Sequence, residues 1–372
     1  MTSDRILLAV DGLPIGGLEG QVVELIRGLR RRGRFQVVLA RLDHGGELER
    51  EALHASAGAL RIRRRARFDW TPGLSLTWQA RRAGIRLIQA QGWMSALAAL
   101  PTARWLGIPL VNATVQDAPP RLRWRHRVAR WCARRSDWIV ANSHAGLEAY
   151  DLRGHSRAQV IANGIELARF DGVLADPPRD PTICMVANFS RFKDHATVIH
   201  AMRIVRASIA NAVLLLIGHD RGTLADSRRL ADRLGLDGAV QFITDSVRPE
   251  SFVARSHVGV LASGSEGLPN AVLEYMALSK PVVATATCGD AVRLIRGGSG
   301  LLVPPRSPEE FARRIVELLD DPERARQMGQ TGRQQVQQFD VDRMVAEHEA
   351  LYERLLRARR STPQPSSAAH HR

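Results

Sequence analysis

The sequence is poor in cysteine and in long apolar runs, and each shortage excludes a class of protein. Three widely spaced cysteines in 372 residues provide neither a disulfide framework nor a zinc cluster, and they suit a reducing compartment. No apolar run approaches the roughly 20 residues that a membrane-spanning helix needs. An acidic residue before the first short apolar run also argues against a signal peptide. We therefore expect a cytoplasmic protein, at most peripheral at the inner face of the membrane.

Lysine is almost absent, since only Lys193 and Lys280 occur among 53 basic residues. Such a bias is typical of genome base composition, so arginine clusters alone are weak functional evidence. The net charge is +15, and the first 180 residues hold 28 basic against 17 acidic residues. A basic half attracts phosphates, anionic lipid or nucleic acid. Because aromatic residues make up only 5% and no known nucleic-acid module is present, we expect no nucleic-acid partner.

Short runs rich in valine, isoleucine and leucine alternate with amphipathic stretches along the whole chain. Continuous apolar runs of this length are typical of strands buried on both faces of a parallel sheet. Repeated strand–helix units predict an α/β fold with doubly wound parallel sheets. The predicted strands are Ile6–Val10, Gln36–Ala40, Leu87–Ala90, Leu110–Thr114, Trp138–Asn142, Ile183–Ala187, Val213–Ile217, Val240–Ile243, Val258–Leu261, Pro281–Thr285 and Leu301–Val303.

The strand–helix pattern runs twice, with a proline- and aspartate-rich segment, Phe170–Pro181, between the two runs. This segment reads as an interdomain linker. We predict one Rossmann-like domain over residues 1–172 and a second over 173–340, facing each other across a cleft. In the second, Ser307 and Glu310 form a plausible capping box for a helix. Residues 359–372 are rich in serine, proline, alanine and histidine near the end, and we expect a disordered tail.

The segment Val258–Thr285 is the most informative, and its pattern is strand, small-residue loop, helix, strand. Glu266 ends the loop, Pro269 suits a first helical turn, and Glu274 follows eight residues after Glu266. Two helical turns take about 7.2 residues, so the two carboxylates share a face. The free N–H groups from Gly267 to Asn270 suit a diphosphate, and carboxylates accept hydrogen bonds from sugar hydroxyls.

The sequence SEGLPNAVLEYMAL, with seven residues between its paired glutamates, resembles the retaining glycosyltransferases of family 4 (group 1), which have the two-domain GT-B fold. Further motifs occur in the family's order and extend the resemblance over about residues 5–356. These motifs are Gly16–Glu19, Val160–Ile165, Asn188–His195, Leu216–Gly218, Gly300–Pro304 and Gly329–Phe339.

The resemblance implies an activity and a division of labour. The first domain would bind the acceptor, the second a nucleotide-sugar donor, and a final helix over 341–358 would return toward the first domain. The first choice for the donor is a UDP-sugar, and the second choice is a GDP-sugar. Transfer would go to a hydroxyl of a glycan or lipid-linked acceptor, with retention, in glycan, polysaccharide or glycolipid biosynthesis. No metal or other cofactor is expected, because Lys193 and a helix end would balance the charge of the leaving group.

The resemblance also implies residue roles. Glu266 would contact hydroxyls of the transferred sugar, Glu274 would hold the ribose, and Lys193 would neutralise the diphosphate. Gln116 and Asp117 occupy the place of the family's His-Asp pair and are candidate catalytic residues. The remaining candidates would contact the donor, and they are Gly17, Asn188, Arg191, Gly267, Leu268, Pro269 and Asn270.

The chain departs from the family pattern at three positions. Asn188 stands where the family commonly has arginine, and Arg191 is the nearest substitute in the sequence. Gln116 replaces the family's histidine, and Arg293 stands where a glutamate is usual. These differences leave other functions open. One alternative is a nucleotide-sugar epimerase, which shares the architecture. Another is a non-catalytic scaffold that binds nucleic acid or a membrane, and the net positive charge is the argument for it.

Two segments have a plain structural interpretation beside the functional one. Asp117 lies just before a proline pair, so capping a loop is as plausible as a role in the cleft. Arg121–Arg135 contains no acid, and its tryptophans, Trp124 and Trp131, recur at helical spacing. We favour a surface helix whose tryptophan stripe packs on the first domain. The alternative is a peripheral contact in which this helix lies on an anionic membrane.

Overall fold

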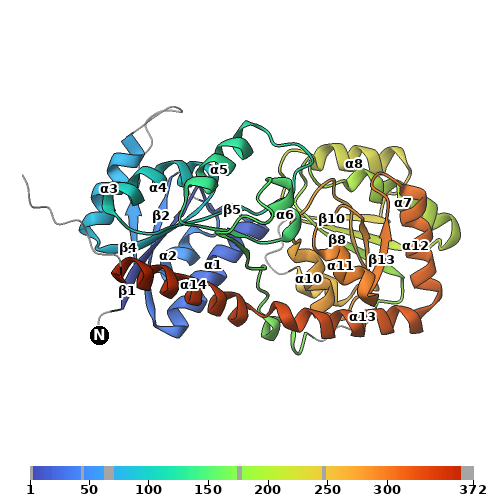
Figure 1. The fold of residues 1–372 in the computed structure, drawn as a ribbon. Coiled ribbons are helices and arrows are strands. Elements are labelled where there is room, and N and C mark those ends of the chain that lie inside the picture. Colours follow the sequence, from blue (N-terminus) through green and yellow to red (C-terminus); the bar gives the residue numbers. More distant parts are fainter. Residues whose placement is uncertain (1–2, 43–45, 63–70, 174–177, 245–248, 362–372) are drawn as a thin grey trace, which may run out of the picture.

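The computed structural model describes residues 3–42, 46–62, 71–173, 178–244 and 249–361. It contains two Rossmann-like domains side by side, each a parallel sheet with helices on both faces (Figure 1). The predicted α/β fold class is therefore confirmed. In the described part of the chain, no helix combines the length and apolarity that crossing a membrane would require.

The N-terminal sheet has the strand order β3-β2-β1-β4-β5-β6-β7, and all its pairings are parallel. Its five predicted strands are confirmed within one or two residues. The short edge strands β3 and β7 were not predicted, because half-buried edge strands lack the continuous apolar run of central ones. The strands are β1 (Asp4–Val10), β2 (Phe35–Arg41), β3 (Gly58–Arg61), β4 (Ile85–Gln91), β5 (Leu110–Val115), β6 (Trp138–Ala141) and β7 (Ala158–Val160).

Helices cover both faces of this sheet and bury apolar clusters against it. On one face α1 (Gly17–Arg32) packs against α2 (Glu49–Ala55) and α14 (Val341–Ser361). On the other, three helices lie side by side (Figure 1). They are α3 (Thr71–Arg82), α4 (Trp93–Leu106) and α5 (Trp124–Arg135), and the short α6 (His144–Ala149) follows β6. One of the apolar clusters, a small one, lies under α5 and α6.

The C-terminal sheet has the order β10-β9-β8-β11-β12-β13 and is also parallel. Its six predicted strands are confirmed. The strands are β8 (Thr182–Val186), β9 (Val213–Ile217), β10 (Val240–Ile243), β11 (Val258–Leu261), β12 (Val282–Thr285) and β13 (Gly300–Val303). The helices are α7 (His195–Ser208), α8 (Leu224–Arg233), α9 (Glu250–Ala254), α10 (Asn270–Ala277), α11 (Ala291–Leu294), α12 (Pro308–Asp320) and α13 (Pro322–Val336).

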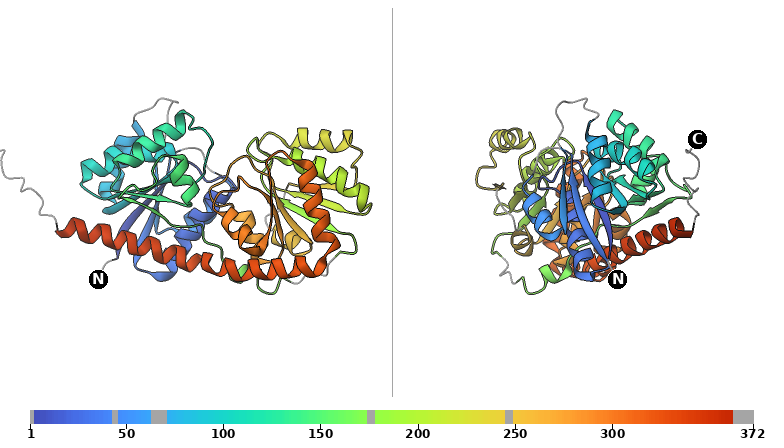
Figure 2. Two further views of the ribbon diagram at one scale, coloured as in Figure 1. Left: turned by 45° about the vertical axis from the view of Figure 1, so that its right-hand side comes forward. Right: turned by 90° about the vertical axis from the view of Figure 1, so that its left-hand side faces the viewer.

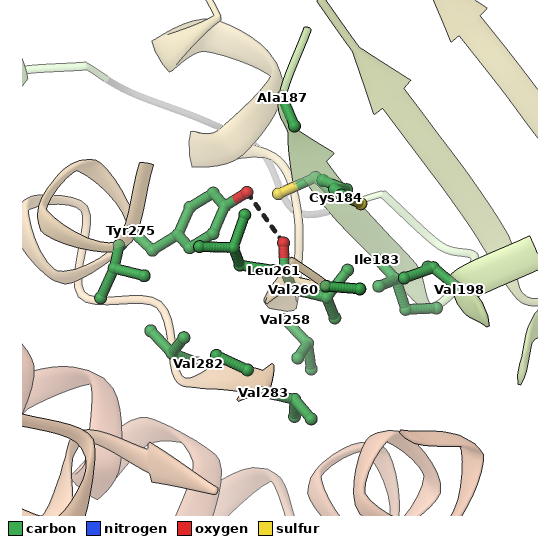
Figure 3. Packing of buried hydrophobic residues seen from close by; sticks show 14 of the residues in the cluster. Ile183, Cys184, Ala187, Val198, Val258, Val260, Leu261, Tyr275, Val282 and Val283 are labelled. Carbon is green, nitrogen blue, oxygen red and sulfur yellow. Dashed lines mark hydrogen bonds between the residues drawn. The ribbon is translucent and has the colours of Figure 1, made fainter. Parts of the chain in front are cut away.

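Tyr275 anchors α10 to the centre of this second core (Figure 3). Its fully buried hydroxyl donates to the carbonyl of Val260 at 3.1 Å and accepts from the N–H of Val186 at 2.7 Å. A Cβ on Gly259 would lie 2.5 Å from the tyrosine ring, so only glycine fits there. These contacts fix α10, through its second turn, to β8 and β11. In open α/β sheets, ligands bind beside the carboxyl ends of the parallel strands.

The chain crosses between the domains twice. The first crossing follows β7, and it places Phe170 in the C-terminal core rather than in the linker expected to begin there. Residues 174–177 of that segment lie outside the described residues. At the second crossing, α13 gives way to α14, which runs back along the N-terminal domain (Figure 2). Ion pairs tie α14 to α1, including one between Arg31 and Asp342 at 3.1 Å.

Two local expectations are wrong at helix ends. α14 continues to Ser361, so residues 359–361 are helical rather than part of a tail, and Arg360 pairs with Asp4 at 2.9 Å. Residues 362–372 lie outside the described residues. The capping box of α12 does not form, because Glu310 is held by two hydrogen bonds from Arg313, at 3.1 and 2.7 Å. The bidentate pair with Arg313 occupies the carboxylate that the capping box would need.

The favoured packing of the α5 tryptophans on the domain is wrong, apart from an edge contact of Trp124 with Trp93 on α4. Trp124 and Trp131 are 54% and 45% exposed. The side of α5 that packs on the domain instead carries Ala129, Cys132 and Ala133, all of them buried. Small side chains let the helix approach the sheet and α4 closely, which turns the indoles outward.

The close approach of α1 and α14 gives a stability prediction. A Cβ on Gly28 would lie 2.3 Å from Cγ2 of Val345, whereas a Cβ on Gly20 of the same helix would meet nothing within 4 Å. We expect Gly28→Ala to destabilise the protein by about 1–3 kcal/mol through overpacking. Gly20→Ala should stabilise it by about 0.5–1 kcal/mol through helix propensity. Thermal denaturation of both variants tests this, and an equal or higher Tm for Gly28→Ala would contradict it.

Candidate active site

Lys193 and Glu266 form an ion pair where the loops after β8 and β11 meet. Backbone hydrogen bonds join the two loops, from the N–H of Asp194 to the carbonyl of Ala262 at 2.9 Å and from that of Gly264 to Phe192 at 3.2 Å. The side chains of Lys193 and Glu266 are only 23% and 15% exposed. The structure therefore brings together two residues that the sequence separates by 73 positions, in a partly desolvated place where charge interactions are strong.

The helix α7 fixes the direction of the lysine loop. Asp194 caps α7, because its carboxylate accepts from the N–H of Thr197 at 3.1 Å. His195 is buried and stacks on Phe189, with ring centroids 4.4 Å apart. Burial lowers the pKa of His195 to about 4, so the ring is neutral near pH 7. Its role is structural.

Glu274 lies on the second turn of α10 and is partly buried. Its carboxylate makes no hydrogen bond or ion pair with the residues that the structure describes. Burial raises the pKa of Glu274 to about 7, with Arg169 opposing the rise and Glu250 adding to it. Those two neighbours pair with each other at 3.5 Å. A carboxylate in this position is ready to accept hydrogen bonds from a ligand.

The first turn of α10 has no side-chain cap and points at the opposite domain. Pro269 stands at the cap position, and Asn270 donates from Nδ2 to the carbonyl of Gly17 at 3.0 Å. Asn163 at the domain crossing donates to Oδ1 of Asn270 at 2.7 Å and to the carbonyl of Leu268 at 3.0 Å. The starts of α1 and α10, one from each domain, thus face each other. Uncapped helix starts present free N–H groups and a positive dipole end.

Gly267 is pressed against the N-terminal domain. A Cβ there would lie 2.6 Å from Oδ1 of Asn142, 2.9 Å from Oγ of Ser143 and 3.0 Å from the carbonyl oxygen of Gln116. Its own carbonyl accepts from the N–H of Asp290 at 2.9 Å. Only glycine leaves room for the two domains to approach this closely.

Asn188, where the family commonly has arginine, links two loops rather than presenting a charge. Its Nδ2 donates to the carbonyl of Ile15 at 3.2 Å, and its Oδ1 accepts from the N–H of His219 at 3.1 Å. Arg221 donates to the same Ile15 carbonyl at 3.2 Å. Arg191 is exposed and makes no hydrogen bond or ion pair with the described residues, so the structure does not tie it to this group.

Gln116 and Asp117, at the end of β5, are both held by their own domain. Gln116 donates to the carbonyl of Ala113 at 3.1 Å. Asp117 accepts from the hydroxyl of Tyr150 at 2.8 Å, and its other oxygen lies 3.7 Å from Nε2 of His126. These contacts favour the loop-anchoring interpretation of Asp117. The loop reaches the other domain through Ala118, whose carbonyl accepts a hydrogen bond from the hydroxyl of Ser265.

Sequence reasoning missed the interdomain contact made by Asp290. Its carboxylate accepts from the N–H groups of His144 and Ala145 at 2.8 and 3.0 Å, and it lies 3.0 Å from Nδ1 of His144. The missed residues Asn142 and Ser143 follow β6 directly. A search of all carboxyl ends of the predicted strands would have marked both loops as facing the cleft.

Comparison with known proteins identifies the family. The model described as "Glycosyltransferase Family 4" matches residues 15–169, and that described as "Glycosyl transferases group 1" matches residues 169–335. The lipopolysaccharide core biosynthesis glycosyltransferase LpsE of Rhizobium meliloti is 30% identical over 319 residues, 82% of this chain and 86% of LpsE. A D-inositol 3-phosphate glycosyltransferase of Corynebacterium efficiens is 26% identical over 309 residues, 73% of this chain and 72% of that protein.

Solved structures share the fold. Anabaena HepE in complex with UDP and glucose superposes with a TM-score of 0.82 at 19% identity, over 94% of this chain and 99% of HepE. Sucrose-phosphate synthase of Thermosynechococcus elongatus gives 0.77 at 22% identity, over 95% of this chain and 100% of the synthase. The sequence relatives and this shared fold lead to one conclusion: the chain belongs to the family 4 (group 1) glycosyltransferases and is a transferase with the GT-B fold.

Proposed function

We propose that this glycosyltransferase uses a UDP-sugar and transfers the sugar, with retention, to a hydroxyl of a glycan or lipid-linked acceptor. The donor binds the domain assigned to residues 173–340, and the acceptor binds the domain assigned to residues 1–172. The choice of UDP as the nucleotide of the donor is supported by HepE, whose structures contain UDP and UDP-glucose. A role in cell-surface polysaccharide or lipopolysaccharide synthesis is supported by the name of LpsE.

The observation that carries the proposal is the Lys193–Glu266 pair beside the uncapped start of α10. A donor diphosphate brings two negative charges and competes with Glu266 for the ammonium group. Once displaced, Glu266 is free to accept hydrogen bonds from the hydroxyls of the transferred sugar. Lys193 and the helix dipole then stabilise the negative charge that grows on the leaving diphosphate. On this proposal the reaction needs no metal.

Closure of the two domains completes the site. Gly17 approaches the diphosphate by its backbone, close to Asn270, and Glu274 accepts from the ribose hydroxyls. Closure also excludes water, which would otherwise hydrolyse the donor. We place departure and attack on the same face of the sugar, with the leaving diphosphate assisting removal of the acceptor proton. This route needs no protein nucleophile.

Calorimetry with UDP, GDP and ADP, with and without EDTA, tests the donor assignment. We expect UDP to bind most tightly and EDTA to leave its affinity unchanged. Tighter binding of another nucleotide would overturn the choice of UDP, and loss of binding in EDTA would overturn the metal-free proposal. Transfer from the matching nucleotide-sugar, with the anomeric configuration of the product determined by NMR, then tests retention.

The raised pKa of Glu274 gives a pH prediction for donor binding. Ribose hydroxyls bind the ionised carboxylate, so the affinity for UDP-glucose should be highest above the pKa of about 7 and fall as the pH drops through it. The limiting slope is roughly tenfold per pH unit. UDP-glucose is chosen because its diphosphate does not titrate near neutrality. Glu274→Gln should flatten the profile, and an unchanged slope in that variant would assign the titration to another group.

A further inference from the structure

The outward side of α3, α4 and α5 carries four exposed indoles. Trp78 on α3 and Trp105 on α4 are 59% and 68% exposed, and Trp124 and Trp131 on α5 add 54% and 45%. The three helices are neighbours on one face of the N-terminal sheet (Figure 1). Arg81 of α3 lies 5.9 Å from the Trp105 ring of α4, which joins the exposed surfaces of these two helices. Large exposed aromatic side chains in such numbers mark an interaction surface.

The segment that contains these helices is rich in arginine. Residues 71–135 contain eleven arginines, no lysine and a single acid, Asp117, although Arg130 and Arg134 pair with Asp151 outside this segment. Guanidinium groups lie over the exposed indoles, with Arg82 4.6 Å from the Trp78 ring and Arg135 4.3 Å from the Trp131 ring. Neither arginine pairs with a carboxylate among the described residues. Their charge is therefore available to an anionic partner.

We propose that this α3–α4–α5 face, defined by the four indoles and their arginines, docks on an anionic lipid membrane. Tryptophan prefers the headgroup region of a bilayer, and arginines beside it are attracted to anionic headgroups. Leu74 and Leu97 are 76% and 46% exposed on α3 and α4. These aliphatic side chains favour a lipid surface over a nucleic acid, which would need stacking platforms along a basic groove.

The docking face reaches the other domain beside Lys193. Trp93 at the start of α4 packs edge-on against Trp124, with ring centroids 4.9 Å apart. Arg123, just before α5, lies 5.7 Å over the ring of Phe192, which precedes Lys193 in the other domain. A hydroxyl carried on a membrane-anchored acceptor would enter beside these residues. This consequence rests on the proposed function, and it makes a lipid-linked acceptor the preferred substrate class.

Sedimentation with vesicles tests the docking face on the full-length protein. The vesicles are phosphatidylcholine alone and phosphatidylcholine mixed with phosphatidylglycerol. We expect binding to the mixed vesicles and little to the neutral ones. In Arg82→Gln/Arg135→Gln, partitioning should fall roughly 25-fold, because each arginine near an anionic surface contributes about fivefold. Trp105→Gln/Trp131→Gln should also weaken it. The matched control, Arg203→Gln/Ile204→Gln on α7, changes an exposed arginine and isoleucine of the other domain and should bind as the unmodified protein does.

Three outcomes would overturn the inference. They are no binding to mixed vesicles, equal binding to neutral vesicles, and loss in the α7 control equal to that in the arginine variant. Binding to an RNA or DNA duplex without binding to vesicles would replace the lipid by nucleic acid. UDP affinity is measured in solution on the same samples. A protein that binds UDP but no vesicles rejects only the docking face, and one that binds vesicles but no nucleotide rejects the donor site.

Discussion

Replacing Lys193 by alanine is expected to lower kcat/KM for sugar transfer by about 10²–10³-fold. The ammonium group lies in the loops that follow β8 and β11, is partly shielded from water and pairs with the carboxylate of Glu266. On the proposed mechanism it balances charge that appears on the diphosphate as the glycosidic bond breaks. The loss should therefore fall on kcat more than on the affinity for the intact donor.

Steady-state transfer kinetics measure this effect, and two controls separate it from a folding defect. Lys193→Ala leaves Glu266 partly buried without its partner, so the double variant Lys193→Ala/Glu266→Gln removes both charges and should recover the Tm but not the rate. Arg203→Ala removes an exposed cation from α7 and should leave both the rate and the Tm unchanged. A rate within threefold of the original in Lys193→Ala would reject the assignment of this residue to the leaving group.

Glu274→Ala is expected to weaken UDP binding by about 10²-fold, since hydrogen bonds to a charged group contribute about 1.5–3 kcal/mol each. Calorimetry measures this loss directly. Glu274 is suited to the comparison because the described residues give it no partner that the substitution would strand. The conservative variant Glu274→Gln keeps one acceptor oxygen, so its affinity for UDP should lie between those of the unmodified protein and Glu274→Ala. Unchanged affinity in Glu274→Ala would place the ribose elsewhere.

The ionised carboxylate of Glu274 should also lower the free energy of unfolding when no donor is added. The pKa of Glu274 rises from 4.5 to about 7 on folding, so the folded state prefers the protonated acid. Below pH 4.5 the group is neutral in both states, and the penalty appears as the pH rises toward 7, reaching on the order of 3 kcal/mol above it. Glu274→Gln should thus raise the Tm above pH 7 and leave it unchanged in acid. A lower Tm at high pH would show that the carboxylate is stabilised in the folded state.

The architecture could be predicted from sequence because buried parallel strands have a distinctive signal. Runs such as Val258–Leu261 are apolar at every position, since both faces of the strand are covered. The edge strands Gly58–Arg61 and Ala158–Val160 are only half-buried, so their composition does not separate them from loops. The capping box at Ser307 could not be predicted reliably for another reason. Its glutamate, Glu310, can also pair with a nearby arginine, and the sequence does not show which contact forms.

The candidate site was predicted less completely. The spacing of Glu266 and Glu274 and the position of Lys193 after a buried strand could be seen in the sequence. The ion pair between Lys193 and Glu266 could not, because it depends on how the loops after β8 and β11 meet. The contact of Asp290 with the start of α6 was missed for the same reason, since the two partners belong to different domains.

The sequence by itself determined the two parallel-sheet domains, the family and the candidate donor residues, because apolar periodicity and motif spacing are local properties of the chain. Only the tertiary structure decided which charges meet and which side of α5 faces outward. Helical spacing placed Trp124 and Trp131 on one stripe but could not orient it. The domain buries the small residues Ala129, Cys132 and Ala133 against the sheet and α4 instead, and that packing leaves the indoles exposed.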